Sequence, residues 1–420
     1  MHRTERPMVT LPPWPQLDEE MVDAAAAVLR SGRVNYWTGD QGRSFEAEYA
    51  QHLGIRHALA VANGTVALEL ALRAVGVRPG DEVVVPSRTF IATASAVVAV
   101  GARPVCADVD RETQGLSVES VAEVITARTT AVVPVHLGGW PMAIRELCTW
   151  ARGRGLRVVE DCAQAHDALV GGRHVGTFGD AGAFSFCQDK ILTTAGEGGL
   201  VVTEDEVAFD KAWSYRDHGK SRDAVFQRQH PPGFRWLHES FGTNWRMTEV
   251  QAAVGRVALR RLPRWVEARR EHAGLLSAAL GDLPMVRVPH PTGGVQPSWY
   301  RWYAFLRPDA LAPGWNRDRV VAAVTERGVP CFAGSCPEIY KEAAFPETWR
   351  PPAPFPVARE LGETSIALLV HPTLSTSDVQ RSAQALAEVL VTASTSVAGQ
   401  GDASQCPRRV GQHSAPPSLD

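Results

Sequence analysis

Residues 82–109 read EVVVPSRTFIATASAVVAVGARPVCADV. The β-branched run at the start predicts a buried strand, the alanine- and valine-rich middle predicts a helix, and the last six residues predict a second strand. The same alternation runs from Asn63 to Leu200. Strands that alternate with helices in this way are typical of a parallel sheet wrapped by helices. The sequence therefore predicts an α/β fold.

A second, smaller unit is expected after this region. A long helical pattern, EVQAAVGRVALRRLPRWVEARREHAGLLSAAL, begins at Glu249, and we expect it to break or kink at Pro263. Further strand and helix patterns follow in WYRWYAFLRP, DRVVAAVTERGVP and SDVQRSAQALAEVL. We expect residues 1–258 to form an N-terminal arm and a large domain, and residues 259–395 a smaller C-terminal α/β domain. Residues 396–420 are polar and rich in Gly, Ser and Pro, which predicts a disordered tail.

Composition excludes several classes of function. The chain has 420 residues, 45% hydrophobic and 21% charged, with a net charge of −3. The sequence contains no basic run interleaved with aromatic residues, so it does not predict a nucleic-acid partner. No stretch approaches the roughly 18 apolar residues of a membrane span, and the N-terminus lacks an apolar signal core, so we expect a cytoplasmic protein. The seven cysteines lack C-x-x-C spacing, which argues against a zinc site or a disulfide framework, and we expect no metal.

Lysine is rare in this chain. Lys and Arg together number 43, but only four are lysines, at positions 190, 211, 220 and 341. Unlike arginine, a lysine can lose its proton and act as an amine nucleophile. Lys190 lies in FCQDKILTTAGEGG, residues 186–199, between an apolar strand and a glycine-rich turn. There a desolvated amine could be held partly neutral. The alternative is a strand-end lysine whose ammonium group reaches water.

In open α/β sheets, ligands bind at the carboxyl ends of the strands. Asn63, Gly64 and Thr65 open a predicted helix, whose free N–H groups suit a phosphate, although simple helix capping is the alternative. Asp161 ends the strand RVVED and could pair with a cationic ring nitrogen, or could cap a helix. Phe90 follows another strand, where its ring could lie on a flat cofactor or belong to the core.

Two more polar side chains occupy strand positions. Ser185 could turn its hydroxyl toward a phosphate or simply pack, and His136 could be an acid/base group or a structural histidine. An anion site, a carboxylate for a ring nitrogen, an aromatic platform and an imine-forming amine are together what pyridoxal phosphate (PLP) requires. The sequence therefore predicts a PLP site centred on Lys190. His218–Ser221, HGKS, ends like a P-loop but lacks its earlier glycine and its context, so ATP binding is rejected.

Several motifs carry a resemblance to a known family. These are ANGTVALELAL, GDEVVVPSRTFIATASA, PVCADVD, VVEDCAQAH, GDAGAFSFCQDKILTTAGEGG and GTNWRMTEVQAA. From about Pro13 to Leu390 the chain resembles the sugar aminotransferases of the DegT/DnrJ/EryC1/StrS group, within the fold-type I PLP enzymes. The resemblance implies a large domain with a mixed, mostly parallel sheet between helices, followed by the smaller α/β domain.

The resemblance also implies roles for individual residues. Lys190 would form the Schiff base, Asp161 would hold the pyridine nitrogen, Phe90 would stack on the ring and Gln164 would approach the phenolic oxygen. The phosphate contacts would be Gly64, Thr65, Ser185 and, from the neighbouring subunit, Asn244, which makes a homodimer obligatory. Cys187-Gln188-Asp189 is an unusual sequence for the family, but the spacing from Ser185 to Lys190 is kept.

The activity expected is ping-pong transamination. An amino acid, expected to be glutamate, would supply nitrogen to a ketone of a nucleotide-linked (deoxy)sugar in amino-sugar biosynthesis, with a ketocyclitol or related ring as the alternative acceptor. A PLP-dependent sugar dehydratase is a second reading, although some related dehydratases carry histidine where this chain has Lys190. A PLP-binding regulator without turnover is the third, and no DNA-binding segment supports it.

Acceptor contacts are expected from cations. Lys220 and Arg222 belong to a loop, SYRDHGKSRDAVF, that we expect to be mobile and to close over a diphosphate, unless it is a solvated turn. His136 and His371 are further candidate substrate contacts.

Overall fold

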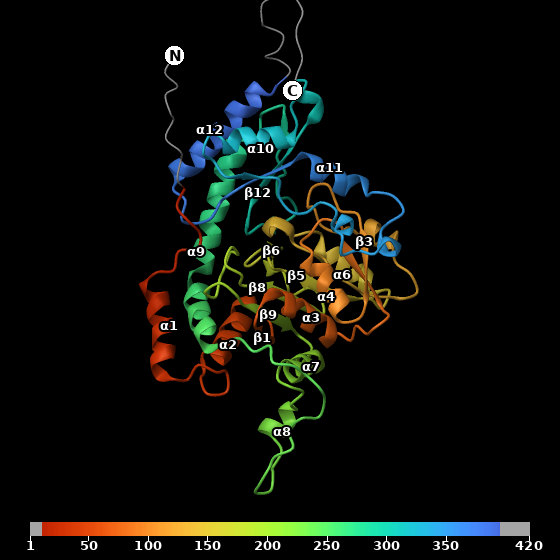
Figure 1. Cartoon of the computed structure of the whole chain (residues 1–420), viewed down its shortest axis with the longest axis vertical. Helices are drawn as coiled ribbons and strands as arrows, with labels where there is room; N and C mark the ends of the chain where they lie inside the picture. The colour runs from red at the N-terminus through yellow and green to blue at the C-terminus, as the bar shows by residue number, and fades with distance from the viewer. Residues whose placement is uncertain (1–10, 395–420) are drawn as a thin grey trace, which may run out of the picture.

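The computed structural model describes residues 11–394 and contains one large central sheet (Figure 1). Its seven strands lie in the order β1-β9-β8-β5-β4-β2-β3. β9 runs antiparallel to both of its neighbours, and the other adjacent pairs are parallel. The expected mixed, mostly parallel sheet is confirmed. The strands are β1 (His57–Val61), β2 (Glu82–Pro86), β3 (Arg103–Ala107), β4 (Thr129–Val132), β5 (Arg157–Asp161), β8 (Ala181–Ser185) and β9 (Gly199–Thr203).

Helices cover both faces of this sheet because the strand residues alternate between two apolar cores. Val83 and Val85 of β2 pack in the core that includes residues of α3, α4 and α7, whereas Val84 packs with residues of α5 and α6 on the opposite face. Strands buried on both faces read as continuous apolar runs, which explains EVVVP. The helices are α2 (Gln41–Leu53), α3 (Gly64–Ala74), α4 (Ala92–Ala99), α5 (Val118–Ala122), α6 (Ile144–Arg152) and α7 (Glu206–Arg216).

A single long helix, α9 (Glu249–Leu280), links the large sheet to the second domain (Figure 1). It begins with a capping box in which Thr248 accepts from the Gln251 N–H and the Gln251 side chain accepts from that of Thr248. Of the two outcomes expected at Pro263, a break is wrong, because the helix passes through this residue. Burial of both flanking stretches, at Leu259, Leu262 and Val266, outweighs the loss of one helical N–H. The helix also crosses the expected domain boundary at residue 258.

The second domain is a four-stranded antiparallel sheet in the order β10-β12-β14-β13. The C-terminal half of α9 shares its core with α10 and α12. The strand and helix patterns that the sequence shows after α9 are therefore confirmed as elements of this domain. The elements are β10 (Val286–Arg287), β12 (Trp302–Leu306), α10 (Arg317–Thr325), β13 (Cys331–Phe332), α11 (Pro356–Thr364), β14 (Ser365–Leu368) and α12 (Thr376–Thr392). The tail expected to be disordered, residues 396–420, lies outside the described residues.

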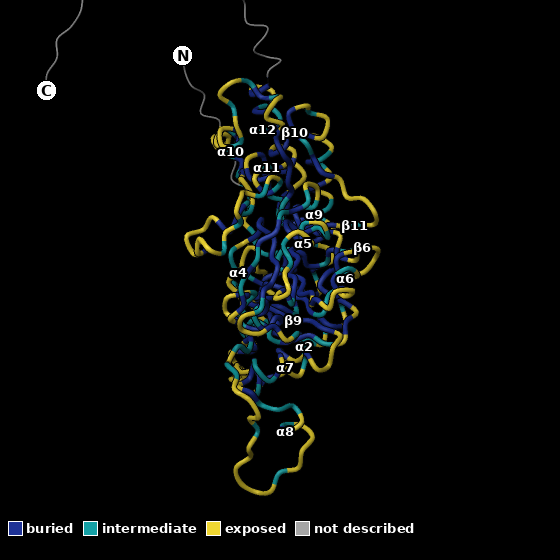
Figure 2. The backbone as a smooth tube through the Cα atoms, turned by 90° about the vertical axis from the view of Figure 1, so that its right-hand side faces the viewer, coloured by how far each residue is buried: buried dark blue, intermediate teal, exposed yellow. Residues whose placement is uncertain are grey.

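Three smaller parts complete the fold. A three-stranded sheet contains β6 (Leu169–Val170), β7 (Arg173–His174) and β11 (Val295–Gln296). Helix α8 (Arg222–Phe226) and the following segment to residue 241 project from the end of the molecule below α7 (Figure 1). Figure 2 shows that this arm is mostly exposed. Single-turn 3-10 helices occur at Leu137–Gly139, Pro308–Ala310, Ile339–Lys341 and Glu347–Trp349.

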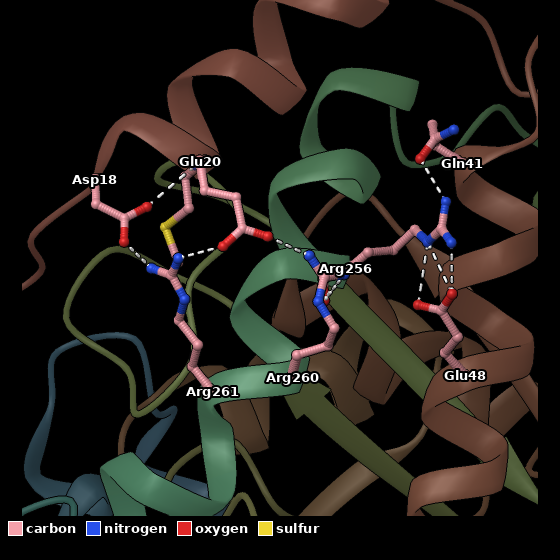
Figure 3. A network of polar contacts seen from close by, with 8 residues as sticks. Asp18, Glu20, Gln41, Glu48, Arg256, Arg260 and Arg261 are labelled. Atoms are coloured by element: carbon pink, nitrogen blue, oxygen red, sulfur yellow. Dashed lines mark hydrogen bonds and ion pairs between the residues drawn. The ribbon is translucent and has the colours of Figure 1, made fainter.

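The N-terminal helix α1 (Glu19–Ser31) is fastened to α9 by charged side chains (Figure 3). Arg261 pairs with both Asp18 and Glu20, and Arg260 pairs with Glu20. One turn earlier on α9, Arg256 forms a forked ion pair with Glu48 of α2. The three arginines therefore join both N-terminal helices to the helix that connects the domains.

Candidate active site at the carboxyl end of the sheet

Asp161 and Ser185 end two adjacent parallel strands, β5 and β8, where Asp161 pairs with Ala183. The Asp161 carboxylate is buried, accepting hydrogen bonds from the Thr93 hydroxyl at 2.9 Å and the Ala163 N–H at 3.1 Å. Burial raises the pKa of this carboxyl above its usual value, which the two hydrogen bonds only partly offset. A cation placed against it would restore the ionised form. Asp161 is therefore suited to a protonated ring nitrogen.

The first turn of α3 lies directly against Ser185. Asn63 caps this helix, since its side chain accepts from the Val66 N–H at 3.0 Å. A Cβ on Gly64 would lie 2.5 Å from the Ser185 Cβ, and a Cβ on Gly199 would lie 2.2 Å from the Asn63 carbonyl oxygen. Only glycine fits at both positions. The close approach sets the helix N-terminus, with the exposed Thr65, beside a strand-end hydroxyl, which is suitable for a phosphate.

Lys190 is mostly buried and has acidic and aromatic neighbours. Its Nζ lies 3.3 Å from Asp189 Oδ1 and 5.0 Å from the centre of the Tyr300 ring. The Tyr300 hydroxyl donates to Asp189. Burial acts to lower the pKa of Lys190, but Tyr300 and Asp189 outweigh it and raise the pKa above its ordinary value. The expectation of a partly neutral amine is wrong here, because it ignored the charge of the preceding residue.

Phe90, the candidate aromatic platform, and Gln164, a second candidate polar contact, lie near Asp161. Phe90 is 65% exposed, and its carbonyl accepts from the N–H of Thr93, the residue that also contacts Asp161. A ring this exposed is not part of the core, the alternative left open by the sequence. Gln164 lies three residues beyond Asp161, and its side-chain oxygen accepts from the Gly138 N–H at 2.8 Å. Its amide N–H₂ is the group that could face a phenolic oxygen.

Sequence reasoning missed three contributors to this region: Trp14, Thr93 and Tyr300. The Trp14 indole N–H donates to the Lys190 carbonyl oxygen at 2.8 Å. Tyr300 comes from the second domain, just before β12. Neither residue lies at a strand end of the large sheet, so the rule that located the others could not find them. Thr93 lies one helical turn after Phe90, and this spacing was the one sequence signal that could have identified Thr93 as a residue of the site.

Both candidate substrate histidines are occupied by structural contacts. His136 is fully buried, its Nε2 lies 3.1 Å from Glu160 Oε2, and its Nδ1 accepts from the Met142 N–H. These contacts favour the structural alternative for His136. His371 bonds to the Thr373 hydroxyl at 2.8 Å and stacks on Trp14, so it reaches Lys190 only through that indole. Burial lowers the pKa of His371 to about 4, which keeps the ring neutral at pH 7.

The structure does not bring Lys220 and Arg222 to Lys190 as free cations. Lys220 Nζ lies 3.2 Å from Asp217 Oδ1, and Arg222 pairs with Glu206 and Asp210. The segment expected to be a mobile loop is partly helical, because it includes the end of α7 and all of α8. Ser221 caps α8 through the Ala224 N–H, which accounts for the helix in a polar stretch.

Asn244 is exposed in the segment that leads from the arm to α9, and it forms an isolated bridge with Asp217. Its exposed amide is available to another molecule.

The residues at the strand ends fit PLP by their chemistry: a buried carboxylate, a helix N-terminus beside a serine, an exposed ring and an amine.

Comparison with known proteins decides the family. Residues 15–387 match the model of the DegT/DnrJ/EryC1/StrS aminotransferase family. The chain belongs to this family. It is therefore a PLP-dependent aminotransferase.

Relatives match the chain over most of its length. A UDP-N-acetyl-3-dehydro-alpha-D-glucosamine 3-aminotransferase from Acidithiobacillus ferrooxidans is 35% identical and covers 92% of this chain and 98% of its own. An L-glutamine:2-deoxy-scyllo-inosose aminotransferase from Streptomyces kanamyceticus is 39% identical over 76% of each. The solved aminotransferase of Psychrobacter cryohalolentis is 46% identical, with a TM-score of 0.90 over 91% of this chain and 100% of its own.

Proposed function

We propose that this aminotransferase moves an amino group from an amino acid, glutamate first among the candidates, to the ketone of a nucleotide-linked sugar or deoxysugar in amino-sugar biosynthesis. The observation that carries the proposal is that the charge of Lys190 acts on the buried carboxyl of Asp161, beside the strand whose Ser185 contacts the first turn of α3. The Acidithiobacillus ferrooxidans relative, which is named for a UDP-linked sugar and matches 92% of the chain, supports this acceptor class.

When bound, PLP supplies the carbonyl that takes up the donor nitrogen and a ring that withdraws electrons from the donor α-carbon. We assign Asp161 to the ring nitrogen, because its buried carboxylate is stabilised by a cation. The remaining contacts follow from position: the phosphate at Gly64, Thr65 and Ser185, the ring face at Phe90 and the phenolic oxygen at Gln164.

Lys190 is the proposed acid/base group. Asp189, 3.3 Å from its Nζ, favours the ammonium form and therefore makes the free amine a stronger base. Once released from the cofactor by the donor, the amine takes the proton from the donor α-carbon, and Asp189 stabilises the ammonium that results. Lys190 would then give that proton, as a general acid, to the cofactor carbon that bears the nitrogen.

We propose a homodimer in which Asn244 reaches the phosphate in the partner's site. Large apolar side chains are exposed along the arm, which supports an interface there. They are Phe226, Phe234, Trp236 and Phe241. Lys220 and Arg222, which bond to acids in their own chain, would meet an acceptor only across such an interface.

No helix among the described residues is long and apolar enough to cross a membrane. We propose a cytoplasmic location, which suits the six free cysteines that the described chain contains.

The test is turnover. The holoenzyme is incubated with glutamate and a panel of nucleotide-linked ketosugars and ketocyclitols, and products are identified by mass spectrometry, with Lys190→Ala as the inactive control. Donor-dependent gain of an amino group on a nucleotide sugar supports the proposal. The Streptomyces kanamyceticus relative favours the second candidate, a ketocyclitol. Loss of water from the sugar without a donor would identify a dehydratase, and no turnover with any compound would favour a PLP-binding regulator.

A further inference from the structure

A group of two histidines and one aspartate lies outside the PLP site. His52 comes from the last turn of α2, Asp167 from the turn after β5, and His174 from β7. His52 Nε2 lies 2.9 Å from Asp167 Oδ1, and His174 Nδ1 lies 3.5 Å from the same oxygen. The one donor atom that each residue offers lies within 4.8 Å of the other two. Positions so far apart in the sequence gave no motif from which such a site could be predicted.

The spacing fits a small metal ion. Zinc binds histidine nitrogen and carboxylate oxygen at about 2.0–2.2 Å, so neighbouring ligands around a tetrahedral ion lie roughly 3.3 Å apart. The two distances to Asp167 Oδ1 bracket this value. The imidazole rings have centres 5.1 Å apart, with an angle of 44° between their planes. The three side chains are 12–20% exposed, which leaves access for an ion and for water as a further ligand.

One atom of the group makes no hydrogen bond, although it lies 3.5 Å from Asp167 Oδ1. His174 Nδ1 is shielded from solvent and makes no hydrogen bond with any described residue. A buried ring nitrogen left in this state costs free energy unless something binds it. Arg270, the nearby cation, donates to the main-chain carbonyl oxygens of Asp167 and Pro297 at 3.1 and 2.9 Å. Arg270 therefore acts on the Asp167 carboxylate through its charge but occupies neither carboxylate oxygen with a hydrogen bond.

We propose that His52, Asp167 and His174 form a binding site for a divalent transition metal of the zinc type, which takes two imidazole nitrogens and one carboxylate oxygen. On binding, the metal takes the lone pair of His52 Nε2 in the neutral tautomer whose single proton lies on Nδ1, and the contact between Nε2 and Asp167 is replaced by ligation of both groups to the ion. Nitrogen and oxygen ligands of this kind favour Zn²⁺ over Mg²⁺ or Ca²⁺.

The proposed ion would act through the loop that it fastens. Asp167 lies six residues after Asp161 and three after Gln164, and its backbone is left-handed, with φ of 62°. An ion here joins this loop and the β6–β7 hairpin to α2. The ion would stabilise the loop that follows Asp161, and so the PLP site, without touching the cofactor.

Metal binding to the holoenzyme tests the proposal. After removal of bound metals with EDTA, the protein is titrated with Zn²⁺ by calorimetry, and crystals soaked in Zn²⁺ are examined by anomalous diffraction. One ion per chain is expected, with the anomalous peak between the three side chains. Saturating Zn²⁺ should also raise the unfolding temperature while the absorption spectrum of the bound cofactor stays the same.

Variants give the decisive comparison. His174→Ala and the isosteric Asp167→Asn should each weaken Zn²⁺ binding by roughly 100-fold. His290→Ala, at an exposed histidine in another loop, should bind as the wild type does. Retained cofactor absorbance shows that each variant is folded. Unchanged affinity in Asp167→Asn, an anomalous peak at cysteine or at the PLP site alone, or no binding by the wild type would overturn the proposal.

Discussion

The indole N–H of Trp14 donates a hydrogen bond to the main-chain carbonyl of Lys190 at 2.8 Å, across 176 positions of the sequence. Trp14 also packs edge-on against Trp265 of α9, with ring centres 5.2 Å apart, and lies 5.1 Å from the Arg269 guanidinium. The N-terminal segment thus holds the backbone of the proposed catalytic lysine against the helix that joins the two domains.

Trp14→Phe should therefore affect both stability and turnover. The substitution keeps a ring but removes the N–H, so we expect the free energy of unfolding to fall by about 1 kcal/mol. The donor half-reaction should slow because the Lys190 backbone loses an anchor. Urea unfolding and stopped-flow absorbance measure the two effects. Trp315→Phe, in the second domain, should leave the half-reaction unchanged, and an equally unaffected rate in Trp14→Phe would reject this role.

Asp189→Asn should make Lys190 less basic. Asp189 helps to raise the pKa of the amine above its ordinary value, so its neutralisation should lower that pKa. A larger share of neutral amine would then be present at neutral pH, and the apoenzyme should react faster with added PLP. The rate of cofactor loading as a function of pH measures the shift. Asp318→Asn, at an exposed residue paired with Arg317, is the matched control. An unshifted profile in Asp189→Asn would contradict this assignment.

Gly64→Ala should loosen the phosphate end of the site. The new Cβ would lie 2.5 Å from the Ser185 Cβ, so α3 or β8 must move. Overpacking of this kind costs about 1–3 kcal/mol. We expect the variant to lose its cofactor on dialysis, as followed by absorbance.

Gly274→Ala is the control for that change. Gly274 is an exposed residue in the C-terminal third of α9, and an added Cβ would meet no atom within 4 Å. The substitution should stabilise the protein by up to about 1 kcal/mol and leave cofactor retention unaltered. Full retention in Gly64→Ala would show that the close approach does not support cofactor binding.

Acidification should destabilise the protein through His166. Burial lowers the pKa of His166 to about 4, and the neutral ring accepts from Tyr49 and donates to the Ser185 carbonyl oxygen. The unfolded chain, with a histidine pKa of about 6.5, binds the proton first. Stability from this residue is therefore complete above about pH 6.5 and is lost as the pH falls toward about 4.

The size of that loss can be measured at intermediate pH. Near pH 5 the contribution of His166 should have fallen by about 2 kcal/mol. Chemical denaturation of the wild type and of His166→Gln between neutral pH and pH 5 isolates it, because Gln keeps a donor and an acceptor but does not titrate. Parallel curves for the two proteins would assign the acid sensitivity to other groups, such as His371.

The α/β fold and the strand-end residues were predictable because both follow from local patterns. Residues 83–86 are apolar throughout because β2 is buried on both faces, and Asp161 and Ser185 come together because adjacent parallel strands end at one edge. Pro263 was misjudged because its helix is stabilised by packing along its whole length, which no local propensity reports.

The ion pairs of the candidate site residues were the other feature that the sequence could not predict. The ion pairs of Lys220 and Arg222 join residues of different elements or turns, and the Asp189 effect on Lys190 depends on side-chain direction. The contacts of Trp14 and Tyr300 with the lysine region are set by how distant segments pack, so no spacing in the sequence predicts them.

The close approaches at Gly64 and Gly199 also bear on how such an enzyme can diverge. Where main chain meets main chain or a strand-end Cβ, as at these two positions, any side chain would force the surrounding backbone to shift, so we expect substitutions there to weaken cofactor binding. Selection for a new acceptor would leave both glycines untouched. Accepted changes would accumulate instead at exposed positions away from the strand ends and the proposed interface, so descendants would share one cofactor cradle while their substrates drift apart.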